Sequence, residues 1–149
     1  MTGLVAVSLE GVLRAEVGQS VIPEGFNLYQ ALVTTYRVAV VLDDEDSELA
    51  SLWLRKEGMR NFVLLHPRRR LDDRVGQYRR LMALGPVEMV IDASPAAVAG
   101  AMELGLPAML FGHPRTHRPE WRPDYERAPR AWDTLVQQVE SQRAVDATA

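Results

Sequence analysis

Residues 4–13 read LVAVSLEGVL. Their first part, Leu4–Ser8, is a short apolar run of the kind that forms a strand buried on both faces. Four later runs have the same character, at Val38–Leu42, Phe62–Leu65, Val87–Ile91 and Ala108–Phe111. The chain is therefore predicted to contain about five strands.

Between these runs the apolar residues recur with helical spacing. The predicted helical stripes are Leu28, Ala31, Leu32 and Thr35; then Leu49, Leu52 and Trp53; then Val75, Tyr78 and Met82; and finally Trp132, Leu135, Val136 and Val139. A further helix is predicted between Ser94-Pro95 and Gly105, because serine caps a helix and proline suits its first turn. Alternation of strands and helices predicts a three-layer α/β domain with a doubly wound parallel sheet.

The composition fits one globular domain of 149 residues, with 47% hydrophobic and 25% charged residues. We expect the domain to span residues 1–142, with a frayed tail over 143–149. Seventeen basic and twenty acidic residues give a net charge of −3, which makes nucleic-acid binding an unfavourable interpretation. The absence of cysteine excludes disulfides, thiolate zinc sites and a cysteine nucleophile.

The sequence has no apolar run of the ~18 residues that a membrane span needs, and its start lacks the basic region of a signal peptide. A cytoplasmic protein with no membrane partner is the resulting expectation. Lys56 is the only lysine, and the other sixteen basic residues are arginine. This bias is typical of a GC-rich coding genome, such as that of a bacterium or a phage.

Ligands of open parallel sheets bind beyond the carboxyl ends of the strands. At those ends the sequence places Ser8 and Glu10 after the first strand and Asp43 after the second. His66 follows the third strand, and Asp92 follows the fourth. These residues are the first candidates for a functional site.

The first strand and the turn after it, with Gly11 and Leu13, resemble the first motif of the haloacid dehalogenase-like (HAD) superfamily of phosphatases. In that family the strand ends in Asp-x-Asp-Gly-x-Leu and leads into a flap, here Arg14–Gly25. Residues 90–95 and 105–111 resemble the fourth motif and the fifth strand. The resemblance covers about three-quarters of the chain, and the expected strand order is 5-4-1-2-3. No insertion is long enough for a substantial cap domain, so the chain looks like a cap-less member.

The resemblance is weaker at the catalytic positions. Ser8 stands where the family has its nucleophilic aspartate, and a serine alcohol needs a base to become nucleophilic. Glu10 stands where the family has its acid/base aspartate and is one methylene longer. Leu42 or Asp43 occupies the place of the second motif's Ser or Thr.

The last two motifs are also incomplete. The third motif needs a Lys or Arg; Lys56 does not match its place, and Arg79 is the candidate. The fourth motif supplies two acids for magnesium. Asp92 is present, but Ala93 and Ala96 cannot bind a metal. The residues at the catalytic motif positions are thus Ser8, Glu10 and Arg79.

Three acids remain as candidate metal ligands: Glu10, Asp43 and Asp92. If they converge, their oxygens could hold Mg²⁺ in a weak or vestigial site. The acidic run Asp43–Asp46 has a simpler interpretation, which is capping of the helix that follows. No cofactor is required by the sequence, and Mg²⁺ is possible.

Two basic regions are further candidates for contacts. The first contains Arg68, Arg69 and Arg70 with Arg74, Arg79 and Arg80; it is either a solvated face or a contact for phosphate or a partner's acids. The second is the Arg/Pro/Trp segment 113–130, which is expected to pack as a C-terminal wrap anchored by Trp121 and Trp132. His66, His113 and His117 do not have metal-ligand spacing.

The first function hypothesis is a catalytically degenerate HAD-like domain that acts as a binding or protein-interaction module. Its partner would be a protein or a small phosphorylated ligand. The alternative is an active Mg²⁺-dependent phosphomonoesterase or nucleotidase with an atypical motif set. A third hypothesis is an assembly protein that makes its contacts through the segment 113–130.

Overall fold

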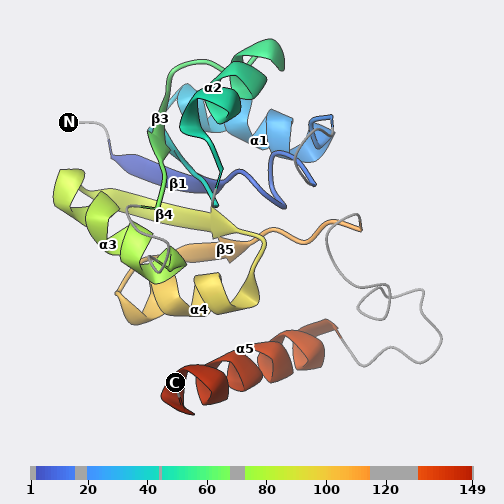
Figure 1. Ribbon diagram of the computed structural model, residues 1–149, viewed down its shortest axis with the longest axis vertical. Helices are drawn as coiled ribbons and strands as arrows, with labels where there is room; N and C mark the ends of the chain where they lie inside the picture. Colours follow the sequence, from blue (N-terminus) through green and yellow to red (C-terminus); the bar gives the residue numbers. More distant parts are fainter. Residues whose placement is uncertain (1–2, 16–19, 44, 68–72, 115–130, 149) are drawn as a thin grey trace.

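The computed structural model describes residues 3–15, 20–43, 45–67, 73–114 and 131–148 (Figure 1). In these ranges five strands alternate with five helices. They are β1 (Leu4–Ser8), α1 (Pro23–Val33), β2 (Arg37–Val41), α2 (Ser47–Lys56), β3 (Phe62–Leu65), α3 (Arg74–Leu84), β4 (Val87–Asp92), α4 (Pro95–Glu103), β5 (Ala108–Leu110) and α5 (Ala131–Thr148). No described strand or helix lies outside this alternation, so no cap domain is evident in this part of the chain.

The five strands form one sheet in the order β3-β2-β1-β4-β5, and every neighbouring pair is parallel. This is the predicted order 5-4-1-2-3 read from the opposite edge. β1 is the central strand, and Val7 lies between Val40 of β2 and Ile91 of β4. The predicted α/β fold class and the central place of Leu4–Ser8 are therefore confirmed.

The two faces of β1 bury side chains in two separate clusters. Val5 and Val7 pack in the cluster that includes Tyr29 of α1 and Leu54 of α2. Ala6 lies in the other cluster, which includes residues of α3 and α4. Figure 1 shows the same division, with α1 and α2 on one side of the sheet and α3 and α4 on the other. Burial on both faces explains why β1 has no polar alternation.

Three of the helices begin at capped N-termini close to the carboxyl edge of the sheet. The side chain of Asp46 accepts from the backbone N–H groups of Glu48 and Leu49. Asp73 caps α3, and Ser94 caps α4. Capping is thus the role of Asp46, which the sequence placed in the acidic run of residues 43–46.

The buried faces of the helices match the predicted stripes in part: Leu32 and Tyr78 are buried as predicted. In α2 the buried residues are Ala50 and Leu54, whereas Leu49 and Leu52 are each 65% exposed. In α1, Tyr29 and Leu32 are buried, and in α3, Gln77, Tyr78 and Leu81 are buried. Apolar residues occur on two sides of these helices, so a spacing of three or four residues fits either side.

Two predicted boundaries are also corrected. The flap predicted over Arg14–Gly25 ends earlier, because α1 begins at Pro23. At the other end of the chain, α5 continues through residues 143–148, for which a frayed tail was expected. Arg143 in this part of α5 lies 2.8 Å from the Glu103 carboxylate of α4.

Candidate functional site

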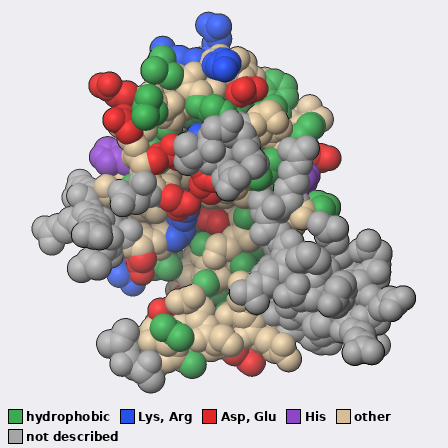
Figure 2. All heavy atoms as spheres, turned by 45° about the vertical axis from the view of Figure 1, so that its right-hand side comes forward, with side chains coloured by type: hydrophobic (Ala, Val, Ile, Leu, Met, Phe, Trp, Pro, Cys, Tyr) green, Lys and Arg blue, Asp and Glu red, His purple; other side chains and the backbone are tan. Residues whose placement is uncertain are grey.

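A cleft of about 660 Å³ opens at the carboxyl ends of β1, β2 and β4. Among its lining residues are Ser8, Glu10, Asp43 and Asp92, which the sequence predicted to lie at this edge of the sheet. The N-terminal turns of α3 and α4 and the last turns of α5 complete its walls. Figure 2 shows acidic and basic side chains meeting in a hollow on this face of the molecule.

Ser8 is held inside the turn that follows β1. Its side chain is buried, and its Oγ donates a hydrogen bond to the backbone oxygen of Glu10 at 3.0 Å. In the described part of the chain no imidazole or carboxylate is hydrogen-bonded to this hydroxyl. The hydroxyl proton therefore stabilises the turn, and no neighbouring base is in place to remove it.

Arg14 neutralises the acids on one side of the cleft. This arginine is only 2% exposed; its Nε donates to the Glu10 carboxylate at 2.8 Å, and its Nη2 pairs with Glu45. The guanidinium also lies over the Trp53 ring, 5.1 Å from the ring centroid, at the distance of a cation–π contact. Burial raises the pKa of Glu10, although the Arg14 guanidinium acts in the opposite direction.

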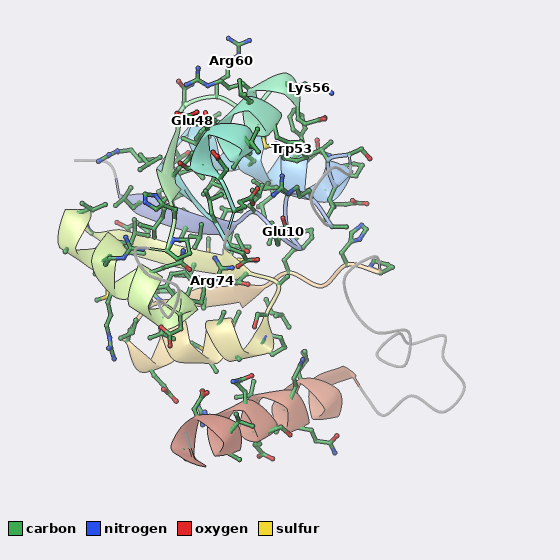
Figure 3. All side chains as sticks on the ribbon, in the orientation of Figure 1. Glu10, Glu48, Trp53, Lys56, Arg60 and Arg74 are labelled. Carbon is green, nitrogen blue, oxygen red and sulfur yellow. The ribbon has the colours of Figure 1, made fainter. Side chains whose placement is uncertain are left out.

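Arg74 neutralises two further carboxylates of the cleft, those of Asp43 and Asp92. It is the first residue of α3; its Nη2 pairs with Asp43, and its Nε lies 3.4 Å from the Asp92 carboxylate. The third nitrogen, Nη1, is buried and has no hydrogen-bond partner among the described residues. Figure 3 shows the side chains of Arg74 and Glu10 near the carboxyl ends of the strands.

Arg79, the predicted basic residue of the third motif, is exposed on α3 and does not line the cleft. Arg74 lines it instead. The sequence offered one signal that could have identified Arg74: it directly follows Asp73, which caps the helix that faces the carboxyl edge of the sheet.

Asp92 is the most buried acid of the cleft. The Tyr78 hydroxyl donates to its Oδ2 at 2.6 Å, and the Ser94 N–H donates to its Oδ1 at 3.0 Å. Burial raises the pKa of Asp92, while Arg74, Tyr78 and the Ser94 N–H act to lower it. The pKa of Tyr78 is raised as well, first by burial and then by the Asp92 charge.

The three predicted metal ligands thus line one cleft, but each has an arginine partner. Glu10 pairs with Arg14, and Asp43 and Asp92 pair with Arg74. Among the described residues, no group of three or more acidic or histidine side chains is arranged to hold a metal ion. The weak Mg²⁺ site remains a prediction from sequence.

The other sequence candidates lie away from this cleft or outside the described residues. Arg68, Arg69 and Arg70 fall outside the described ranges, as do residues 115–130 of the Arg/Pro/Trp segment. His113 stacks on Phe111 and lies 3.4 Å from the Glu24 carboxylate. The backbone oxygen of His66 accepts from Arg80.

Comparison of the sequence with models of protein families and with curated proteins finds no match. Within the ranges that the structure describes, no helix has the length and apolar character needed to cross a membrane.

The buried carboxyl of Asp92 gives a pH prediction. Because its folded-state pKa is raised, the folded protein holds this proton more tightly than the unfolded chain does. The contribution of Asp92 to stability is therefore present at low pH and is lost as the pH rises through the folded-state pKa. In urea unfolding between about pH 4 and 7, Asp92→Asn should remove this part of the pH dependence.

Tyr78→Phe should increase the pH dependence of stability, whereas Asp92→Asn should decrease it. Tyr78→Phe keeps the ring in place but removes the hydroxyl that lowers the pKa of Asp92, so the loss of stability with rising pH should become steeper. If both variants show the same pH dependence as the original protein, Asp92 does not titrate as described.

Proposed function

We propose that this chain is a HAD-like domain that has lost phosphoryl transfer and uses its cleft to bind a small phosphorylated ligand. The hydrogen bond from Ser8 to the Glu10 backbone oxygen is the observation that carries the proposal. The residue at the nucleophile position is buried, and no base among the described residues is hydrogen-bonded to it. The strand order, with β1 at the centre, supports the likeness to the family.

The family's reaction needs a carboxylate that attacks phosphorus and a second carboxyl group that gives and takes a proton. A serine at the first position is un-ionised at neutral pH and needs an adjacent base to attack. Glu10 at the second position is ion-paired with Arg14, and this pair must break before the carboxyl can serve as a proton donor. The serine at the first position removes the attacking carboxylate, and the ion pair of Glu10 hinders proton transfer. Neither feature closes the cleft to a ligand.

Binding needs a cation and an uncommitted donor at the cleft, and among the described lining residues Arg74 is the candidate for both. Its guanidinium is paired with Asp43 and Asp92, so a phosphate must compete with these carboxylates for it. Its Nη1 is buried and has no hydrogen-bond partner among the described residues, and a small shift of the side chain would offer its N–H groups to a ligand. Phosphate oxygens suit a planar guanidinium better than a single-point cation. The N-terminal turns of α3 and α4 at the same cleft add favourable partial charges. Arg74 is thus the residue that corresponds best to the family's third motif.

The catalytic part of the proposal predicts no enzymatic turnover. With aryl phosphate or nucleotides and Mg²⁺, the protein should release no more phosphate than its Ser8→Ala variant. Magnesium-dependent release that Ser8→Ala abolishes would establish the alternative, an active phosphomonoesterase, and refute the proposal.

The binding part is tested by calorimetry with inorganic phosphate and nucleoside monophosphates. Arg74→Gln should weaken binding by about ten-fold or more, because a hydrogen bond to a charged group is lost. Arg79→Gln is the matched control, since Arg79 lies on the same helix but outside the cleft, and it should leave affinity nearly unchanged. Equal effects of the two variants, or no binding to the original protein, would contradict a phosphate site at Arg74.

A further inference from the structure

The C-terminal helix α5 lies on the outer side of α4, away from the sheet (Figure 1). Among its described side chains, Leu135, Val136 and Val139 line a groove together with Pro95, Val98 and Met102 of α4. The groove retains about 260 Å³ of unfilled space, and Val136 is 37% exposed. No described α5 side chain is fully buried, so this contact is much looser than the packing of α1–α4 on the sheet.

The polar contact between the two helices is also weak. Arg143 and Glu103 are 2.8 Å apart, but their side chains are 59% and 63% exposed. Exposed ion pairs contribute little to stability because water and salt screen them. The contacts made by the described side chains of α5, residues 135–147, are therefore easier to break than the core of the domain.

The last turns of the same helix form part of the cleft. Gln142 and Asp146 line it, and the Gln142 Nε2 donates to the Asp146 carboxylate at 3.1 Å. Asp146 adds a negative charge to a cleft that already contains Glu10, Asp43 and Asp92. Docked α5 thus occupies space in the cleft and opposes the entry of an anion.

We propose that α5 is a displaceable cover that competes with anionic ligands for the cleft. The competition for a ligand rests on the proposed function, whereas the cover itself rests only on the contacts of α5. Because the two states of α5 differ in access to the cleft, an anion that binds there shifts the helix toward the undocked state. By the same linkage, docking of α5 weakens the binding of that anion.

The absence of cysteine allows a test with single thiols in the full chain. Ala96→Cys places one thiol on the cleft wall, at the start of α4. Its modification rate is measured with two reagents of similar size, an anionic sulfonate and a cationic trimethylammonium thiosulfonate. The measurement needs no ligand and no activity. Its result therefore tests the cover even if the protein does not bind phosphate.

Val139→Asn weakens the apolar contact of α5, whereas Val145→Asn makes the same change at a position that is 62% exposed and lines neither the groove nor the cleft. We expect Val139→Asn to accelerate modification of the thiol by both reagents, by about ten-fold, since it removes a partly buried valine from the contact. Val145→Asn should change the rates less than two-fold, because substitutions at exposed positions usually have little effect on stability.

Asp146→Asn tests the electrostatic part. At low salt it should raise the rate of the anionic reagent relative to the cationic one by about three-fold, because one charge has been removed from the cleft. An unchanged ratio would show that Asp146 does not oppose anions there.

Hydrogen exchange of the same proteins completes the test. α5 amides should exchange faster in Val139→Asn, while β1 amides keep their protection, which shows that the domain remains folded. Two results would overturn the proposal. One is faster exchange in α5 without faster modification of the thiol; the other is α5 exchange that occurs only together with β1 exchange.

Discussion

Arg14→Met should lower the free energy of unfolding by about 3–5 kcal/mol, because it leaves partly buried carboxylates without their cation. Glu10 and Glu45 are 21% and 14% exposed, and both are bonded to the Arg14 guanidinium. The variant loses these two ion pairs and the contact with the Trp53 ring together. Methionine retains much of the side-chain volume, so the loss reflects charge and hydrogen bonding more than a cavity.

Urea unfolding at neutral pH measures this loss, and two further variants identify its cause. Arg14→Lys keeps the charge but cannot bond both acids with a planar fork, so it should recover only part of the stability. Adding Glu10→Gln to Arg14→Met should restore some stability, since one of the two uncompensated charges is removed. A loss below about 1 kcal/mol in Arg14→Met would show that these ion pairs contribute no more than exposed ones do.

Gly25→Ala is the second substitution with a large expected effect. A Cβ at this position would overlap the backbone oxygen of Val12 and lie 2.7 Å from its carbonyl carbon. The obstacle is backbone in the turn after β1, so α1 or the turn itself would have to move. We expect a loss of about 3 kcal/mol or more, at the upper end of overpacking effects.

Other glycines provide a graded comparison for thermal or urea unfolding. At Gly100 a Cβ would overlap a methyl group of Val75, and a side chain can shift more easily than backbone, so Gly100→Ala should cost about 1–2 kcal/mol. At Gly112 a Cβ would meet nothing within 4 Å, and the substitution should be almost neutral. Equal losses in Gly25→Ala and Gly112→Ala would contradict the close approach of α1 to the turn.

The sheet could be predicted from sequence because its signal is simple. Five short apolar runs separated by helical patterns specify parallel strands buried on both faces, and β1 is the clearest example. The buried faces of the helices were harder to identify. Leu49 and Leu52 of α2 are spaced as core residues are, but the helix buries Ala50 and Leu54 against the sheet. Spacing identifies a stripe, and packing decides which stripe faces inward.

The acids of the cleft could be predicted for a similar reason, since the carboxyl ends of parallel strands meet at one edge. The pairing of these acids with particular arginines could not be predicted. Arg14 and Glu45 are 31 residues apart in the chain, and Arg74 and Asp43 are also 31 residues apart. Only the tertiary structure brings these partners together. Acids that are candidate metal ligands in the sequence are therefore found as members of ion pairs.

The central place of β1 also has a consequence for biosynthesis. β2 follows β1 closely in the chain, but the other edge of β1 is covered by β4, where Val7 lies opposite Ile91. A nascent chain that has emerged from the ribosome only as far as β3 therefore exposes the unpaired backbone groups of its most apolar strand. Open edges of this kind recruit strands from other molecules. Productive folding must await the second half of the chain, and contacts so distant in sequence make it slow.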